Sequence, residues 1–144
     1  MWKFRSMVVN ADQMLDELED QNEIDGAMFK IKDDPRITKI GHTIRKYSLD
    51  ELPQLWNVLI GDMSLVGPRP PLPSEVAEYT DYDKQRLLVM PGCTGLWQVT
   101  RRSEADFDEM VWLDIVYINH SGLWEDLKLI VKTIGVVIHP NGAY

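Results

Sequence analysis

A helix with one apolar side is predicted at residues 107–118, which read Phe107-Asp108-Glu109-Met110-Val111-Trp112-Leu113-Asp114-Ile115-Val116-Tyr117-Ile118. The apolar side chains that share this side are Phe107, Met110, Val111, Tyr117 and Ile118. Asp114 falls on the same stripe. A carboxylate there is either paired with a buried base or functional, because an unpaired buried charge is very costly. We expect a structural pair between Asp114 and an arginine, and we keep Asp114 as a candidate site residue.

The last helix is predicted at residues 123–138. Its apolar stripe consists of Leu123, Leu127, Ile130, Val131, Ile134 and Val137. Such a stripe either packs against other helices or meets a membrane surface, where Trp112 and Trp124 would suit the interface. We favour packing in the core, because most helical stripes in compact domains are buried.

Earlier parts of the chain predict shorter elements. Apolar and basic residues alternate at 1–5, which favours a short strand, and 96–99 is also strand-like. Apolar spacing predicts helices at 11–23 and 37–47. Four prolines surround Arg69 and predict a stiff, extended loop that fixes where its side chain points.

Length and composition fit one domain that covers residues 1–144. The chain is 44% hydrophobic, and no internal repeat or Gly/Ser linker divides it. We therefore expect an α+β fold, a predominantly helical single domain with a few short strands. The 15 Lys and Arg against 23 Asp and Glu give a net charge of −8, which argues against a nucleic-acid partner. The single Cys93 excludes an internal disulfide framework and a multi-thiolate metal site. No apolar run approaches the ~20 residues that cross a bilayer.

The adjacent acids Asp50 and Glu51 are the most informative pair. Ser48 and Glu51 have the spacing of a capping box, although Pro53 leaves open whether the helix starts at Ser48 or near Leu52. At a helix start Asp50 stays ionised and can serve as a nucleophile, and paired carboxylates suit Mg²⁺. Ordinary helix capping is the alternative, and on spacing alone it is favoured.

Basic residues flank this pair in the sequence. Residues 7–29 contain acids and no base, whereas residues 30–46 carry six bases, among them Arg45. Arg69 follows on its stiff loop, and Arg101 and Arg102 form a further pair. Arginine is well shaped for bidentate phosphate contacts, but each of these arginines can equally form a structural ion pair.

Several sequence blocks in a fixed order resemble the bacterial sugar transferases, the monotopic polyprenyl-phosphate phosphoglycosyl transferases. The blocks are Lys3-Phe4-Arg5-Ser6-Met7, Asp34-Pro35-Arg36-Ile37-Thr38, Ser48-Leu49-Asp50-Glu51-Leu52-Pro53-Gln54-Leu55, Asn57-Val58-Leu59, Gly61-Asp62-Met63-Ser64-Leu65-Val66-Gly67-Pro68-Arg69-Pro70, Pro91-Gly92-Cys93-Thr94-Gly95-Leu96-Trp97-Gln98-Val99, Leu113-Asp114 and Asp126-Leu127-Lys128. The resemblance covers practically the whole chain.

The resemblance implies transfer of a sugar 1-phosphate from a UDP-sugar, with galactose or glucose expected, to undecaprenyl phosphate. UMP is released, and the product primes synthesis of capsule, exopolysaccharide or O-antigen. Asp50 would attack the sugar-bearing phosphorus to form a phosphosugar-aspartyl intermediate, and polyprenyl phosphate would then displace the sugar phosphate. Glu51, with Asp50, would bind Mg²⁺.

Other positions match family residues near the site. The resemblance places Lys3, Arg45, Arg69 and Arg102 at phosphate-binding positions, and Asp126 at the position of a further acid. It also implies action at the inner leaflet, on the cytoplasmic face of the bacterial cell membrane.

Two departures from the family pattern matter. Family members usually carry an N-terminal hydrophobic segment before the block at 3–7, so we expect this chain to be the catalytic portion of a longer protein or a shortened relative. Cys93 stands where a branched aliphatic residue is usual, and Arg101 where glycine is frequent. The alternative to an enzyme is a non-catalytic remnant that binds a nucleotide-sugar or a partner protein; a soluble nucleotide hydrolase is a third hypothesis.

Overall fold

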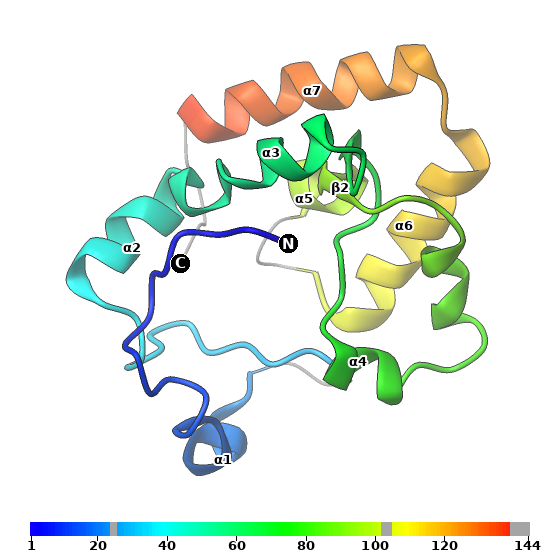
Figure 1. The fold of residues 1–144 in the computed structure, drawn as a ribbon. Helices are drawn as coiled ribbons and strands as arrows, with labels where there is room; N and C mark the ends of the chain where they lie inside the picture. Colours follow the sequence, from blue (N-terminus) through cyan, green and yellow to red (C-terminus); the bar gives the residue numbers. More distant parts are fainter. Residues whose placement is uncertain (24–25, 102–104, 139–144) are drawn as a thin grey trace.

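The computed structural model describes residues 1–144 except 24–25, 102–104 and 139–144. Helices dominate the fold, and the predicted α+β class is confirmed (Figure 1). In chain order the elements are α1 (Leu15–Leu18), η1 (Glu19–Gln21), α2 (Lys39–Lys46), η2 (Leu49–Glu51), α3 (Gln54–Leu59), β1 (Ser64–Val66), α4 (Pro73–Ala77), η3 (Asp83–Leu88), β2 (Gly92–Thr94), α5 (Leu96–Thr100), α6 (Phe107–His120) and α7 (Leu123–Ile138), where η marks a 3₁₀ helix.

The small sheet pairs β1 with β2 in parallel. Ser64 lies opposite Gly92, and Val66 lies opposite Thr94. The backbones touch just beyond the paired residues, because a Cβ atom on Gly92 would lie 2.1 Å from the nitrogen of Gly67. The amide of Gly92 also donates to the carbonyl of Pro68 over 2.8 Å. The proline-rich loop that carries Arg69 therefore starts from a fixed point on the sheet.

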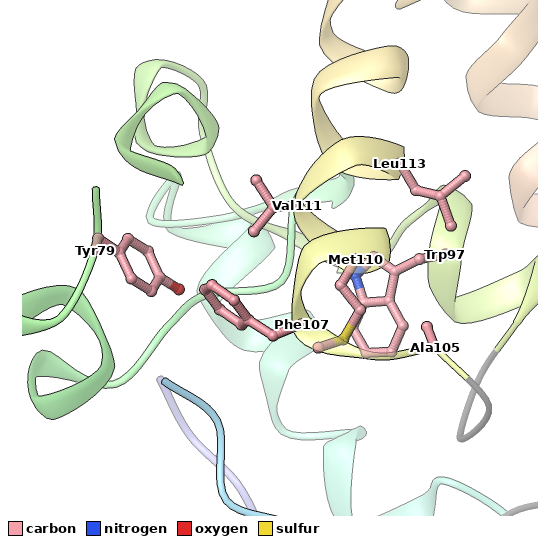
Figure 2. Packing of buried hydrophobic residues seen from close by; sticks show 7 residues of the cluster. All are labelled: Tyr79, Trp97, Ala105, Phe107, Met110, Val111 and Leu113. Carbon is pink, nitrogen blue, oxygen red and sulfur yellow. The ribbon is translucent and has the colours of Figure 1, made fainter. Parts of the chain in front are cut away.

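The main core forms around α6, as the sequence predicts. Four of the five side chains predicted to share its apolar side are buried. One of them, Tyr117, packs in a second cluster with Val66 and Leu129. Figure 2 shows the other three among side chains from other elements in the main cluster. Its buried members are Tyr79, Trp97, Ala105, Phe107, Met110, Val111 and Leu113.

Asp114 lies fully buried on α6 and pairs with Arg86 of η3. The second guanidinium nitrogen of Arg86 donates to the hydroxyl of Tyr79 over 3.2 Å. The prediction that Asp114 pairs with an arginine is confirmed. This contact ties η3 to α6 at the centre of the core.

Two predicted strands are wrong. Residues 1–5 form no strand, and residues 96–99 lie in the helix α5. In α5 the amide of Arg101 donates to the carbonyl of Trp97 over 2.9 Å, and the Trp97 side chain enters the core. A four-residue apolar pattern fits a strand or one helical turn equally well, so packing of Trp97 decides the structure.

The predicted helix at 11–23 is shorter than expected. Only Leu15–Leu18 is α-helical, followed by the 3₁₀ turn Glu19–Gln21. The segment carries several acids and no base to offset them, and short helices are marginal without tertiary packing.

The helix α7 has the predicted bounds but not the preferred environment. Its apolar stripe is largely exposed, with Leu123 at 85%, Val131 at 61% and Ile134 at 55%. The helix contacts the domain through buried Leu129 and through Thr133, whose hydroxyl lies 2.7 Å from that of Thr94. The preference for packing this stripe in the core is therefore wrong. In the described ranges, no helix combines the length and apolar character that crossing a bilayer demands.

Replacement of Arg86 tests the buried pair. Arg86→Met leaves the carboxylate of Asp114 buried and unpaired, so we expect the free energy of unfolding to fall by about 3–5 kcal/mol. The double variant Arg86→Met/Asp114→Leu removes both charges and should recover most of this loss. Urea denaturation measures both values. A double variant as unstable as the single one would contradict a role for the unpaired charge.

Candidate active site

The acids Asp50 and Glu51 lie in η2, immediately before α3. Leu52 and Pro53 keep right-handed helical backbone angles, so η2 and α3 join into one helical run at 49–59. Ser48 precedes this run in the left-handed region, with φ of 54°, and its side chain caps nothing. The predicted capping box at Ser48 is therefore wrong, and the regular α-helix begins only after Pro53, which has no amide hydrogen to donate.

The helical run at 49–59 turns its polar side inward. Asp50 is 8% exposed, and Gln54 and Asn57 are each 3% exposed. Their spacing of four and three residues places them on one side of a helix. The outward side is apolar instead, with Trp56 60% and Leu59 78% exposed.

The N-terminal segment lies against this inward polar side. The amide of Trp2 donates to Oδ1 of Asn57 over 2.9 Å, and the amide of Phe4 donates to the carbonyl of Asp50, also over 2.9 Å. Between them, Nζ of Lys3 lies 2.7 Å from Oε1 of Glu51. Figure 1 shows this segment passing below α3 and α2. These contacts bring Lys3, predicted to bind phosphate, directly to the acidic pair.

Arg45 approaches the pair from α2. Its Nε donates to the hydroxyl of buried Ser6 over 2.8 Å. Burial lowers the pKa of Arg45, the negative charge of Asp50 raises it, and the positive charge of Arg69 lowers it. Arg45 therefore lies within electrostatic range of both Asp50 and Arg69.

Arg69 leaves the sheet on the proline-rich loop and is half-buried. Its Nη1 lies 3.8 Å from the sulfur of Met28, and it lines a small cavity together with Tyr79 and Trp97. None of the ion pairs within the described ranges involves Arg69 or Arg45. Both guanidinium groups therefore keep donors that a phosphate group can accept.

The environment of Asp50 favours a reactive carboxylate. Burial raises the pKa of Asp50, the neighbouring charge of Glu51 raises it further, and Lys3 and Arg45 oppose the rise. Partial removal from water leaves the anion less solvated and so a better nucleophile than a fully hydrated carboxylate. The nearby cations keep an ionised form accessible.

The sheet edge borders the same site. Burial raises the pKa of the Cys93 thiol on β2, and the charge of Glu51 raises it further. A raised pKa leaves little thiolate at neutral pH, so the Cys93 thiol is a poor nucleophile.

The remaining predicted site residues do not join this group in the described structure. Asp114 is held by Arg86. Asp126 on α7 accepts a hydrogen bond from the hydroxyl of Tyr117 over 2.7 Å, which ties α7 to α6. Arg102 lies outside the described residues.

The donor set fits Mg²⁺ only with help from a substrate. No group of three or more His, Cys, Asp or Glu side chains in the part of the chain that the structure covers can hold a metal ion. Mg²⁺ is usually bound by one or two carboxylates together with substrate phosphates. The adjacent carboxylates of Asp50 and Glu51 match that requirement.

Sequence reasoning missed Gln54, Asn57 and Ser6, the polar residues that surround the pair. The signal for Gln54 and Asn57 was their spacing from Asp50, whereas no sequence pattern pointed to Ser6. The usual rule that apolar side chains point inward would have assigned Gln54 and Asn57 to the outer side of the helix.

The fold and site define a small helical domain in which the buried carboxylate of Asp50 lies close to the cations Lys3 and Arg45. A model of the bacterial sugar transferase family matches residues 1–140. The chain belongs to this family.

Named relatives agree with this assignment. The chain is 54% identical over 143 residues to galactosyl transferase CpsE of Streptococcus agalactiae serotype III, which covers 99% of this chain and 32% of the relative. It is 49% identical over 146 residues to the UDP-galactose-lipid carrier transferase of Erwinia amylovora, with 99% and 31% covered. It is 50% identical over 147 residues to the undecaprenyl-phosphate galactose phosphotransferase of Salmonella typhimurium, again with 99% and 31% covered. The chain thus spans about a third of the length of these relatives.

The charges around Asp50 can be tested by titration. Lys3→Gln removes a positive charge that lowers the pKa of Asp50, so that pKa should rise; Glu51→Gln removes a negative charge that raises it, so the pKa should fall. In the unaltered chain Asp50 should titrate above the ordinary value of 3.8. NMR of the labelled carboxyl carbon measures all three values. Shifts of the same sign in both variants would contradict the described arrangement.

Proposed function

We propose that this chain transfers galactose 1-phosphate from UDP-galactose to undecaprenyl phosphate and releases UMP, as a priming step of extracellular polysaccharide synthesis. The observation that carries the proposal is buried Asp50 with Lys3 and Arg45 close to it, and with Arg69 within electrostatic range of Arg45. Family membership and the names of two relatives, which specify UDP-galactose and undecaprenyl phosphate, support it. All four residues are present, and the charges of Lys3 and Arg45 act on Asp50, which favours an enzyme over a non-catalytic remnant.

The transfer proceeds in two displacements at the same phosphorus. A carboxylate oxygen of Asp50 attacks the sugar-bearing phosphorus, and the bond to the bridging oxygen breaks, so that UMP leaves with the electron pair. Asp50 then carries the sugar phosphate as a mixed anhydride. A phosphate oxygen of undecaprenyl phosphate attacks this phosphorus, and the bond to Asp50 breaks, which restores the carboxylate.

Asp50 suits the role of nucleophile better than Glu51. Its side chain is more buried, whereas that of Glu51 is 35% exposed and already bound to Lys3 at 2.7 Å. A carboxylate engaged with a lysine is less available for attack and better placed to hold a cation or orient a substrate.

The cations lower the repulsion between the carboxylate and its anionic substrates. Lys3, Arg45 and Arg69 supply three positive charges, and Arg102 is proposed as a fourth. Asp50 and Glu51 would hold Mg²⁺. When bound, Mg²⁺ supplies positive charge that offsets the charge of the reacting phosphates.

We further propose that the outer sides of α3 and α7 rest on the cytoplasmic face of the cell membrane. Trp56 and Leu59 on α3, and Trp124 on α7, are 60–78% exposed. An amphipathic helix lies at the boundary between headgroups and acyl chains. A helix is about 10 Å across, so Asp50 on the opposite side of the run would lie near the depth of a lipid phosphate. The phosphate of a membrane-bound acceptor could then reach it without leaving the bilayer.

The nucleophile is tested with UDP-galactose and undecaprenyl phosphate in vesicles, with UMP as the measured product. Asp50→Asn should reduce the rate by about 10³-fold or more, because the attacking oxygen is lost. Asp62→Asn, the same change at an exposed position, should leave it unchanged. Without acceptor, mass spectrometry should find Asp50 esterified to sugar phosphate. Full turnover by Asp50→Asn would rule out the covalent role, and donor binding without any UMP would favour the remnant.

The membrane surface is tested by sedimentation with anionic phospholipid vesicles. Trp56→Ser/Leu59→Ser should reduce the bound fraction at least ~10-fold, because two large apolar side chains no longer enter the lipid. Its melting temperature should change little, since both side chains are exposed. Val9→Ser is a matched control: Val9 is 84% exposed and precedes α1, which Figure 1 shows at the other end of the molecule from α7. Equal binding by the double variant would contradict the proposed surface.

A further inference from the structure

The amide side chain of Gln54 has no partner in the part of the chain that the structure describes. Gln54 is the first residue of α3 and is only 3% exposed. Its neighbour on the same side, Asn57, is equally buried but accepts a hydrogen bond from the amide of Trp2. Burial of an unpaired amide is unfavourable, so a residue that merely filled space here would be better replaced by an apolar one.

The Gln54 amide is also not sealed inside the protein. Within the described ranges, four residues have a side-chain nitrogen or oxygen atom that is fully covered by protein and makes no hydrogen bond. These residues are Arg86, Trp97, Gln98 and Asp114. Gln54 is not among them, so its unpaired amide keeps a small contact with solvent.

Gln54 stands beside the proposed nucleophile. Asp50 and Gln54 are both buried and lie four residues, about one helical turn, apart in the helical run at 49–59. A phosphoryl group that becomes bonded to Asp50 would project its non-bridging oxygens into the space beside that carboxylate. Among the buried residues of this run, Gln54 is the uncharged side-chain donor closest to Asp50 in the sequence.

We propose that Gln54 is a substrate-contacting residue whose Nε2 donates a hydrogen bond to a phosphoryl oxygen of the sugar phosphate as it is transferred to and from Asp50. This inference rests on the proposed function. The lysine and arginines reach the site from other segments and supply charge. Gln54 lies in the same helical run as Asp50. Its amide therefore fixes the orientation of the phosphoryl group relative to the attacking oxygen of Asp50 better than a flexible cationic side chain from another segment does.

The test compares activity with stability in the 144-residue chain. Gln54→Met keeps the size of the side chain and removes its hydrogen bonds. We expect kcat/KM for UMP release to fall by about 10²-fold, as for loss of one donor to a transition-state oxyanion. The melting temperature should stay the same or rise, because an unpaired buried amide is replaced by an apolar group.

Two further variants make the result decisive. Gln85→Met, the same change at an exposed position in η3, should alter neither quantity. Asn57→Leu removes the hydrogen bond to Trp2 and should lower the melting temperature. Wild-type kcat/KM in Gln54→Met, or a loss of activity accompanied by a fall in melting temperature like that of Asn57→Leu, overturns the inference. An unaltered chain that releases no UMP contradicts the proposed function itself, whereas an active one with an equally active Gln54→Met contradicts only the role of Gln54.

Discussion

The contact between the N-terminal segment and the helical run at 49–59 is the constraint on which the site depends. Two hydrogen bonds, from Trp2 to Asn57 and from Phe4 to the carbonyl of Asp50, hold the segment in place, and the Lys3–Glu51 ion pair lies between them. The backbone amides of this irregular segment need hydrogen-bond acceptors, and the Asn57 side chain and the carbonyl of Asp50 supply them. Asp50 is buried as a consequence, and its electrostatic environment follows from that position.

This constraint has a second effect on the outer surface. Because the polar side of α3 faces the N-terminal segment, the apolar residues of α3 lie on the outer surface of the protein. The helix α7 shows the same inversion: its inward contacts include Asp126 and Thr133, while its apolar stripe is exposed. The core around α6 supplies the hydrophobic stabilisation instead, so both outer helices are free to carry apolar surface. A soluble domain seldom exposes so many large apolar side chains on helices without a partner for them.

Sequence patterns predict the structure correctly where apolar side chains of a helix are buried and polar ones are exposed. The apolar side of α6 and the arginine partner of Asp114 were predictable, because a carboxylate among core residues demands a base. This rule fails for α7. The length of this helix was predictable from the sequence, but the exposure of its apolar stripe was not. It also hides Gln54, since spacing alone does not tell which side of an amphipathic helix faces inward. Residues 96–99 fail for a different reason, because the packing of Trp97 overrides a short strand-like pattern.

The contact between Gly67 and Gly92 has a topological consequence. It closes residues 68–91 into a lobe that contains α4 and η3, and the glycine pair forms the neck of this lobe. Because the glycine contact holds the two ends of the lobe together, the entropic cost of closing the lobe grows only slowly as residues are added. Residues 81–82 are exposed, so insertions there can lengthen this lobe while the neck preserves the direction in which Arg69 leaves the sheet.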